Sequence, residues 1–279
     1  MGLPLFVLIA ASGISVAAIP PEGPASAPSP DATIIDGPPS DAPISLSVGA
    51  GVIVYPAFPG SAKYKALPIP AVQASYHDIV SISFPDILRV NAVKLADPKV
   101  KAVEFGPLLR YRFGRNIKDD RAYLQGLANR GDALEIGGYL AIAPTRTLRL
   151  QVDAAQATST QLGFSATGSL AYSRPLARAI VSLGPTVTIV DNRYAAAYYG
   201  VSLAEASRSR FKAFAAKGGF ERAGFNATVV VPVSRRWSIV TNADYGHLLG
   251  DAANSPIVRG PRGSVDQLTS LLTISYRLF

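Results

Sequence analysis

Apolar and polar residues alternate with a period of two along most of the chain after residue 43. This period places successive side chains on opposite faces of a β-strand. In residues 103–113 one face is aliphatic or aromatic, and the other carries Glu104, Arg110 and Arg112. Charges opposite an apolar face suit a strand that has lipid on one side and an aqueous lumen on the other. The pattern predicts an all-β fold, a transmembrane antiparallel up-and-down β-barrel.

The polar faces of the other alternating segments consist mainly of Ser, Thr, Gly, Asn and Arg. The water-facing side of a soluble β-sandwich usually carries more Lys and Glu, as expected for an exposed surface. The composition of the polar faces therefore favours a membrane barrel. A secreted soluble sandwich or barrel is the alternative.

The alternation predicts eleven strand segments, and a single-chain bacterial barrel has an even number of strands. We expect twelve strands, with ten as the alternative. Either one strand is hidden within 114–131 or 193–212, or one segment is a loop. The eleven segments are 44–56, 67–77, 79–95, 100–113, 132–143, 147–155, 160–173, 179–191, 215–231, 236–247 and 267–279.

Short polar connections at 144–146, 173–175 and 234–236 predict tight turns at one end of the barrel. The longer connections 193–212 and 248–266 would then lie at the opposite, extracellular end.

Two glycine–proline pairs, at 106–107 and 184–185, fall inside predicted strands. Proline cannot donate to the hydrogen-bond ladder of a sheet, so it is confined to edges and irregular positions. The two pairs predict β-bulges where the strands bend.

The amino-terminal part of the chain differs in composition from the predicted barrel. An apolar run at 3–19 contains the small residues Val16, Ala17 and Ala18, which is typical of a cleaved signal peptide over residues 1–18. A short transmembrane anchor is the alternative. The next segment, 19–43, is rich in proline and is expected to be a disordered linker. The barrel would then occupy residues 44–279.

The last predicted strand runs to the end of the chain at Phe279. Bacterial outer-membrane barrels commonly end on such a strand, which carries the signal for barrel assembly. We assign this role to Tyr276, Leu278 and Phe279, although alternation places Phe279 on the face opposite Tyr276.

Composition limits the remaining chemistry. The chain has 279 residues, no cysteine and a formal net charge of +8. A disulfide framework and a thiolate metal site are therefore excluded. The positive charge suits nucleic acid, an anionic lipid surface or an anion-conducting lumen. Because Lys and Arg are spread along the whole chain, we expect no nucleic-acid partner.

His77 and His247 are the only histidines, so a histidine-based catalyst would have to use one of them. His77 falls in a predicted turn. His247 precedes Ser255, but no nucleophile motif or third orienting residue accompanies the pair. We expect no enzyme activity, no catalytic, cofactor-binding or metal residues, and no cofactor.

Charged residues on the predicted lumen faces are the main candidates for function. They are Glu104, Arg110, Arg112, Arg149 and Asp153. Guanidinium groups that line a pore favour the entry of anions. Pairing of these arginines with Glu104, Glu135 and Asp153 would instead fill a narrow lumen, and we favour this arrangement.

Several segments of the predicted barrel resemble the MipA/OmpV family of outer-membrane proteins. They are GPLLRYRFGR at 106–115, GPTVTIVDNRY at 184–194, YYGVS at 198–202, and Trp237 followed by LLGDAANSPIV at 248–258. The resemblance covers residues 46–278. Two features depart from the family pattern, namely Leu278 before the terminal Phe279 and the proline-rich segment.

The resemblance implies a non-enzymatic barrel in the bacterial cell outer membrane that acts as a scaffold for peptidoglycan-remodelling enzymes. A member of the family binds a lytic transglycosylase, so the expected partners are outer-membrane lipid and a lytic transglycosylase or other murein enzyme. A small outer-membrane channel for anionic solutes is the alternative function.

Overall fold

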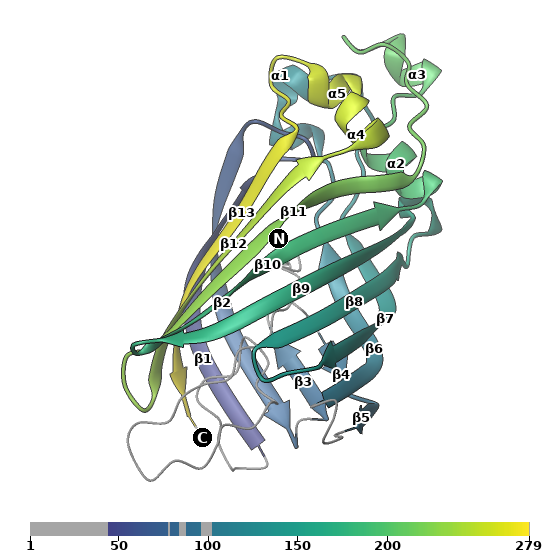
Figure 1. The fold of residues 1–279 in the computed structure, drawn as a ribbon. Helices are drawn as coiled ribbons and strands as arrows, with labels where there is room; N and C mark the ends of the chain where they lie inside the picture. Colours follow the sequence, from purple (N-terminus) through teal and green to yellow (C-terminus); the bar gives the residue numbers. More distant parts are fainter. Residues whose placement is uncertain (1–43, 78, 84–87, 96–101, 279) are drawn as a thin grey trace.

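The computed structural model describes residues 44–77, 79–83, 88–95 and 102–278. These residues form one antiparallel sheet that closes on itself, because β13 (Asp266–Arg277) pairs with both β12 (Trp237–Leu248) and β1 (Ile44–Pro56) (Figure 1). The other strands are β2 (Tyr64–Tyr76), β3 (Val80–Ser83), β4 (Leu88–Val90), β5 (Val93–Leu95), β6 (Ala102–Arg112), β7 (Ala133–Ala143), β8 (Leu148–Ala157), β9 (Phe164–Leu176), β10 (Ala179–Val190) and β11 (Gly219–Pro232).

The described part of the chain occupies twelve strand positions in the barrel. β4 and β5 both pair with β6, at different heights, and together form one interrupted strand. All other strands follow one another around the barrel in chain order. The prediction of a twelve-stranded up-and-down barrel is confirmed, and the alternative of ten strands is wrong.

The predicted place of the twelfth strand is wrong. Residues 114–131 and 193–212 contain helices and no strand of the barrel. Instead, the single segment predicted at 79–95 contains two antiparallel strand positions, because β3 pairs with β4. Between β3 and β4 the sequence contains Pro85 and Asp86, two residue types that favour turns.

The strands β3 and β4 are much shorter than their neighbours. Four positions of β3 pair with β2, whereas thirteen positions of β1 do so. β3 and β4 share two paired positions, and β4 and β6 share two more. On this side, the wall is therefore held by few backbone hydrogen bonds among the described residues.

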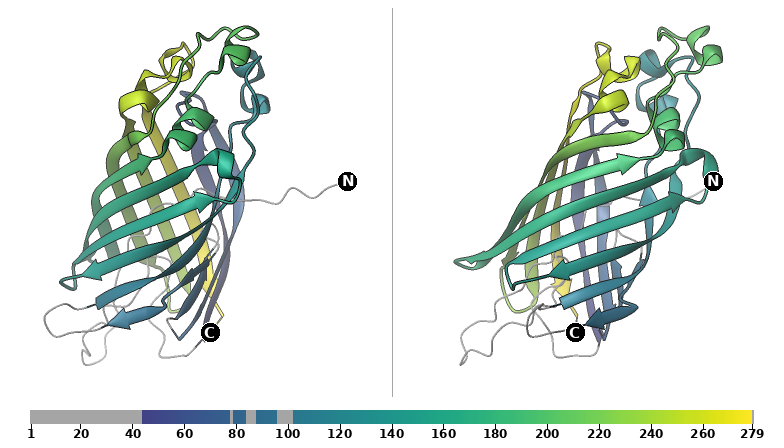
Figure 2. Two further views of the ribbon diagram at one scale, coloured as in Figure 1. Left: turned by 90° about the vertical axis from the view of Figure 1, so that its right-hand side faces the viewer. Right: turned by 45° about the vertical axis from the view of Figure 1, so that its right-hand side comes forward.

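The two ends of the barrel differ in their connections. The loop end, defined by connections 57–63, 113–132, 158–163, 191–218 and 249–265, carries all the helices of the described chain (Figures 1 and 2). These helices are η1 (Ile117–Asp119), α1 (Arg121–Leu124), η2 (Thr160–Leu162), α2 (Asn192–Tyr198), α3 (Leu203–Ala206), α4 (Gly250–Asn254) and α5 (Pro256–Arg259). None of them is long and apolar enough to span a membrane.

The turn end, defined by connections 144–147, 177–178 and 233–236, lies opposite the helices and next to the end of β13 (Figure 1). The turns predicted at 144–146 and 234–236 are confirmed. The turn predicted at 173–175 is wrong, because β9 continues to Leu176 and the chain turns at Ala177, whose φ is 54°. The predicted long connections lie at the loop end, as expected.

Most outward side chains of the strands are apolar and most inward side chains are polar, although Ile53, Tyr55 and Ile69 form a small apolar cluster inside. On β10 the outward residues Leu183, Val187 and Ile189 are 38–50% exposed. The inward residues Ser182, Thr186 and Thr188 are at most 5% exposed. This arrangement inverts that of a soluble protein and is typical of a barrel whose outer surface contacts lipid.

The two glycine–proline pairs interrupt the ladder in different ways. Opposite Pro107, the registers of β4 and β5 against β6 differ by one residue, so the predicted bulge lies on the neighbouring strand. At Pro185, the pairing of β10 with β9 is interrupted without a change of register, so the bulge predicted there is wrong. A register shift instead occurs between Thr188 and Ile189, where β10 pairs with β11.

The predicted signal peptide 1–18 and linker 19–43 lie outside the described residues.

Candidate functional site

One half of the inner wall carries most of the charges of the lumen. The strands β4, β6, β7 and β8 contribute Arg89, Glu104, Arg110, Arg112, Glu135, Arg149 and Asp153. The structure places all five predicted lumen charges on this inner face. Strand alternation alone is therefore enough to locate them, because each lies an even number of residues from the other inward polar residues of its strand.

These inner charges are paired between strands, and two of the pairs join strands that are not adjacent in the sheet. Arg149 Nη2 lies 2.7 Å from Glu104 Oε2, and Arg89 Nη2 lies 3.3 Å from Asp153 Oδ2. Glu135 accepts hydrogen bonds from both Arg110 and Arg112. Arg110 Nη2 also donates to Ser165 Oγ at 2.7 Å.

The opposite half of the wall, from β10 to β13, is lined mainly by hydroxyl and amide groups. Asn242 Nδ2 donates to Asn226 Oδ1 at 3.0 Å and to Thr228 Oγ1 at 2.7 Å. Its charged members include Glu221 and the ion pair between Arg222 and Asp244, whose Nη1 and Oδ1 atoms lie 2.5 Å apart.

The sequence prediction missed Glu221 and Arg222 as inner-face residues. Strict alternation would put two consecutive residues on opposite faces of the sheet. However, Thr188 pairs with Arg222 while Ile189 pairs with Phe220, so Glu221 is the extra residue of a β-bulge. The glycines of β11 nearest to the bulge are Gly219 and Gly224, and neither of them is the inserted residue.

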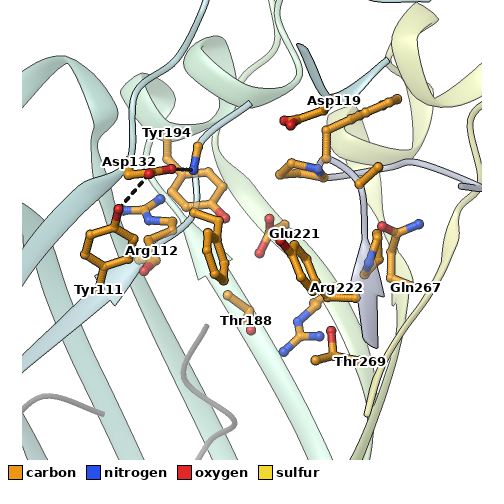
Figure 3. Close-up of a pocket in the computed structure, with 18 of the residues that line it drawn as sticks. Tyr111, Arg112, Asp119, Asp132, Thr188, Tyr194, Glu221, Arg222, Gln267 and Thr269 are labelled. Carbon is orange, nitrogen blue, oxygen red and sulfur yellow. Dashed lines mark hydrogen bonds between the residues drawn. The ribbon is translucent and has the colours of Figure 1, made fainter. Parts of the chain in front are cut away.

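A cavity of about 390 Å³ lies at the loop end of the lumen (Figure 3). Aromatic rings and charged side chains line it together. The rings include Tyr55, Phe58, Phe113, Tyr194 and Tyr199. The cationic residues are Lys65, Arg110, Arg112, Lys118 and Arg222, and the acidic residues are Asp119, Asp132, Glu135, Glu221 and Asp244. With five of each sign, the lining is balanced in charge.

The polar groups of the cavity are largely engaged with one another. The Arg112 guanidinium lies over the Tyr194 ring, 4.3 Å from its centroid, and also contacts Glu135. Its Nε and Nη1 atoms have no hydrogen-bond partner among the described residues, so contact with the ring face replaces part of their hydration. Tyr199 Oη donates to Glu221 Oε1 at 2.7 Å.

Helices and loops of the loop end pack together into what we name the loop cap, formed by connections 57–63, 113–132, 191–218 and 249–265. Two apolar clusters hold it. Their most buried large members are Phe58, Tyr123, Leu124, Tyr198, Tyr199 and Ile257. Because Phe58, Tyr194 and Tyr199 also line the cavity, the loop cap supplies part of the cavity wall.

Buried charges tie the segments of the loop cap to one another. Arg115 Nη1 donates to the Tyr198 backbone oxygen at 2.9 Å. Burial, together with the nearby charge of Arg130, lowers the pKa of Arg115 to about 10, so this side chain stays protonated at neutral pH. Burial opposes ionisation of Asp120, but hydrogen bonds from Arg262 hold the pKa of Asp120 below its usual value.

The structure does not bring His247 and Ser255 into contact. His247 Nδ1 lies 2.8 Å from Asp266 Oδ1. The buried Ser255 hydroxyl instead donates to the Tyr199 backbone oxygen at 2.7 Å and caps α5. His77, with a φ of 48°, lies at the turn between β2 and β3. Within the described ranges, no cluster of three or more His, Asp or Glu side chains could hold a metal ion.

Two of the three proposed assembly residues lie at the turn end. The Tyr276 ring packs against Trp237 with their ring centroids 5.0 Å apart. Leu278 is exposed, and Phe279 lies outside the described residues.

The closed antiparallel wall, its apolar outer face and its polar lumen define a transmembrane β-barrel, with the architecture of outer-membrane barrel proteins. The family model described as "MltA-interacting protein MipA" matches residues 48–278. The chain therefore belongs to the MipA family, which confirms the resemblance seen in its sequence.

Solved structures of other barrels are similar over most of the chain, at low identity. The NanC porin is 12% identical, with 84% of this chain and 100% of that chain covered and a TM-score of 0.39. The Neisserial surface protein A is 10% identical, with coverages of 85% and 98% and a TM-score of 0.24. A Pseudomonas aeruginosa FadL homologue is 8% identical, with coverages of 84% and 89% and a TM-score of 0.33. These TM-scores are too low for any of the three to bear on function. No curated protein matches the chain.

Proposed function

We propose that this protein is a non-enzymatic barrel of the bacterial outer membrane that serves as a scaffold for peptidoglycan-remodelling enzymes, with a lytic transglycosylase as its partner. The observation that carries the proposal is the match of residues 48–278 to the family of the MltA-interacting protein. The partner in that description, MltA, is itself a lytic transglycosylase.

The architecture is compatible with a scaffold. In outer-membrane barrels the short turns face the periplasm, where peptidoglycan lies, and the longer loops face outward. Under this orientation the turn end is the surface available to a periplasmic enzyme. The inner arginines contact carboxylates of the barrel itself, so they already have local partners.

We expect a tagged form of the barrel, solubilised in mild detergent, to retain a lytic transglycosylase in pull-down from a membrane extract. The control is an unrelated barrel of similar size on the same resin. The transglycosylase should be enriched on this barrel and identified by mass spectrometry and by murein hydrolysis in the eluate. Equal recovery on both barrels would contradict the scaffold role.

The second candidate, a channel for anionic solutes, is favoured by the arginines on the inner face. Their pairing with carboxylates argues against it, because a paired guanidinium attracts a passing anion less than a free one. The charge balance of the cavity lining points the same way.

Planar-bilayer recording separates the two candidates. We expect the reconstituted barrel to show no anion-selective conductance steps, because the cationic and acidic residues that line its cavity balance one another. The matched variant is R110Q/R112Q, which should leave the record unchanged. Anion-selective steps that are reduced in the variant would establish the channel and displace the scaffold as the leading function.

A further inference from the structure

Five exposed arginines lie at three successive turns of the turn end. They are Arg146 between β7 and β8, Arg174 and Arg178 at the turn between β9 and β10, and Arg235 and Arg236 between β11 and β12. We name this group the arginine collar. Since these strands are neighbours in the sheet, the three turns follow one another around one side of the barrel.

The arginine collar is not neutralised by carboxylates of the same turns. Residues 144–147, 174–178 and 233–236 contain no Asp or Glu. Among the described residues, none of the five arginines forms an ion pair. At the loop end, by contrast, Arg130 pairs with Glu205 and Arg262 pairs with Asp120. The positive charge of the turns is therefore open to an external anion.

Two arginines of the collar contact tyrosines on the apolar outer face of the barrel. Arg236 Nη1 donates to Tyr276 Oη at 2.8 Å, and the Arg236 guanidinium carbon lies 5.9 Å from the centre of that ring. Arg174 makes the same kind of contact with Tyr172, at 5.6 Å from the ring centre. The guanidinium groups are thus directed along the outside of the wall.

The aromatic residues beside the collar mark the level at which lipid tails give way to water. Trp237 is 47% exposed and packs against Tyr276. Tyrosine and tryptophan on the outer face of a membrane barrel gather at this boundary, because their rings are apolar and their N–H and O–H groups are polar. Arg174 and Arg236 therefore lie at the depth of the lipid headgroups.

We propose that the arginine collar, with Tyr172, Trp237 and Tyr276, binds the phosphate groups of anionic phospholipids in the membrane leaflet next to the turn end. Guanidinium matches phosphate because its planar N–H groups donate two parallel hydrogen bonds. If the partner were an acidic protein surface, we would expect the arginines to point away from the barrel wall and into solvent. The contacts of Arg174 and Arg236 with outward-facing tyrosines favour lipid. The proposal does not depend on an enzyme partner.

The single tryptophan of the chain gives a local probe, because Trp237 follows Arg236 in the sequence and packs against Tyr276. The barrel is reconstituted in vesicles of phosphatidylcholine and phosphatidylglycerol. In one series the phosphatidylglycerol carries brominated acyl chains, and in the other the phosphatidylcholine does, at equal mole fraction. Bromine quenches tryptophan fluorescence on contact. We expect roughly threefold stronger quenching by the brominated phosphatidylglycerol, as an attraction of arginines for anionic lipid predicts.

Two variants separate the collar from the overall charge. R235Q/R236Q removes two collar arginines beside Trp237 and should bring the quenching ratio close to one. R121Q/R193Q removes two exposed arginines at the loop end and should leave the ratio unchanged. A shift in gel mobility on boiling verifies that each variant is folded.

Equal quenching by the two lipids in the native protein would overturn the proposal, as would a ratio that R235Q/R236Q does not change. If quenching is equal but R235Q/R236Q reduces recovery of the transglycosylase in pull-down, the collar binds protein and not lipid. Failure of the pull-down alone contradicts the scaffold role and leaves the lipid result intact.

Discussion

Replacing Glu135 with glutamine is expected to lower the free energy of unfolding by about 3–5 kcal/mol, the usual cost of leaving buried charges without their partner. Glu135 is 1% exposed and accepts hydrogen bonds from both Arg110 and Arg112. In the variant, two guanidinium groups would face each other in the lumen without a compensating charge. Urea titration of the barrel in detergent, followed by tryptophan fluorescence, measures the change.

The control for E135Q is D266N, which makes the same chemical change at an exposed carboxylate that contacts His247 and Tyr245. Solvent screens that site, so D266N should leave the unfolding midpoint nearly unchanged. Equal midpoints for the two variants would show that the Glu135 ion pairs contribute little to stability.

Replacing Gly184 with alanine should lower the free energy of unfolding by about 3 kcal/mol or prevent the barrel from folding. A Cβ at this position would lie 1.7 Å from the backbone oxygen of Leu170. The register of β9 against β10 aligns Leu170 with Pro185, which has no N–H to offer that oxygen. The carbonyl of Leu170 instead lies close to Gly184, and only glycine leaves room for it.

Gly168, in the neighbouring strand β9, provides the matched control. A Cβ there would meet no atom closer than 3.6 Å, at Val187 Cγ1. G168A should therefore refold with native yield, while G184A should show a reduced fraction of the form that shifts on boiling. If both variants refold equally well, the close approach at Gly184 has no energetic importance.

Alternation within a single strand was enough to predict which face of the barrel each charge occupies. Glu104, Arg110 and Arg112 lie two or more residues apart with the same parity, so no tertiary information is needed to place them together. The same parity argument predicts Arg149 and Asp153 on β8. Turn-forming residues likewise predicted the turn at 144–146.

Features that depend on neighbouring strands could not be predicted in this way. The pairing of Arg149 with Glu104 joins residues 45 positions apart, and it depends on the registers of three strands. The bulge at Glu221 is visible only against its partner strand β10. The division of 79–95 into two strand positions was missed because its turn-forming residues lie inside one continuous alternating run.

Among the described residues, the short strands β3 and β4 are joined to each other by as few paired positions as any two strands in the wall. β1 and β13, which carry the two ends of the barrel domain, share eight paired positions, whereas β3 and β4 share two. Local opening of a protein begins where the fewest hydrogen bonds must break. We therefore expect β1 and β13, where the chain closes the barrel, to stay paired during local opening. The strands expected to separate first are β3 and β4.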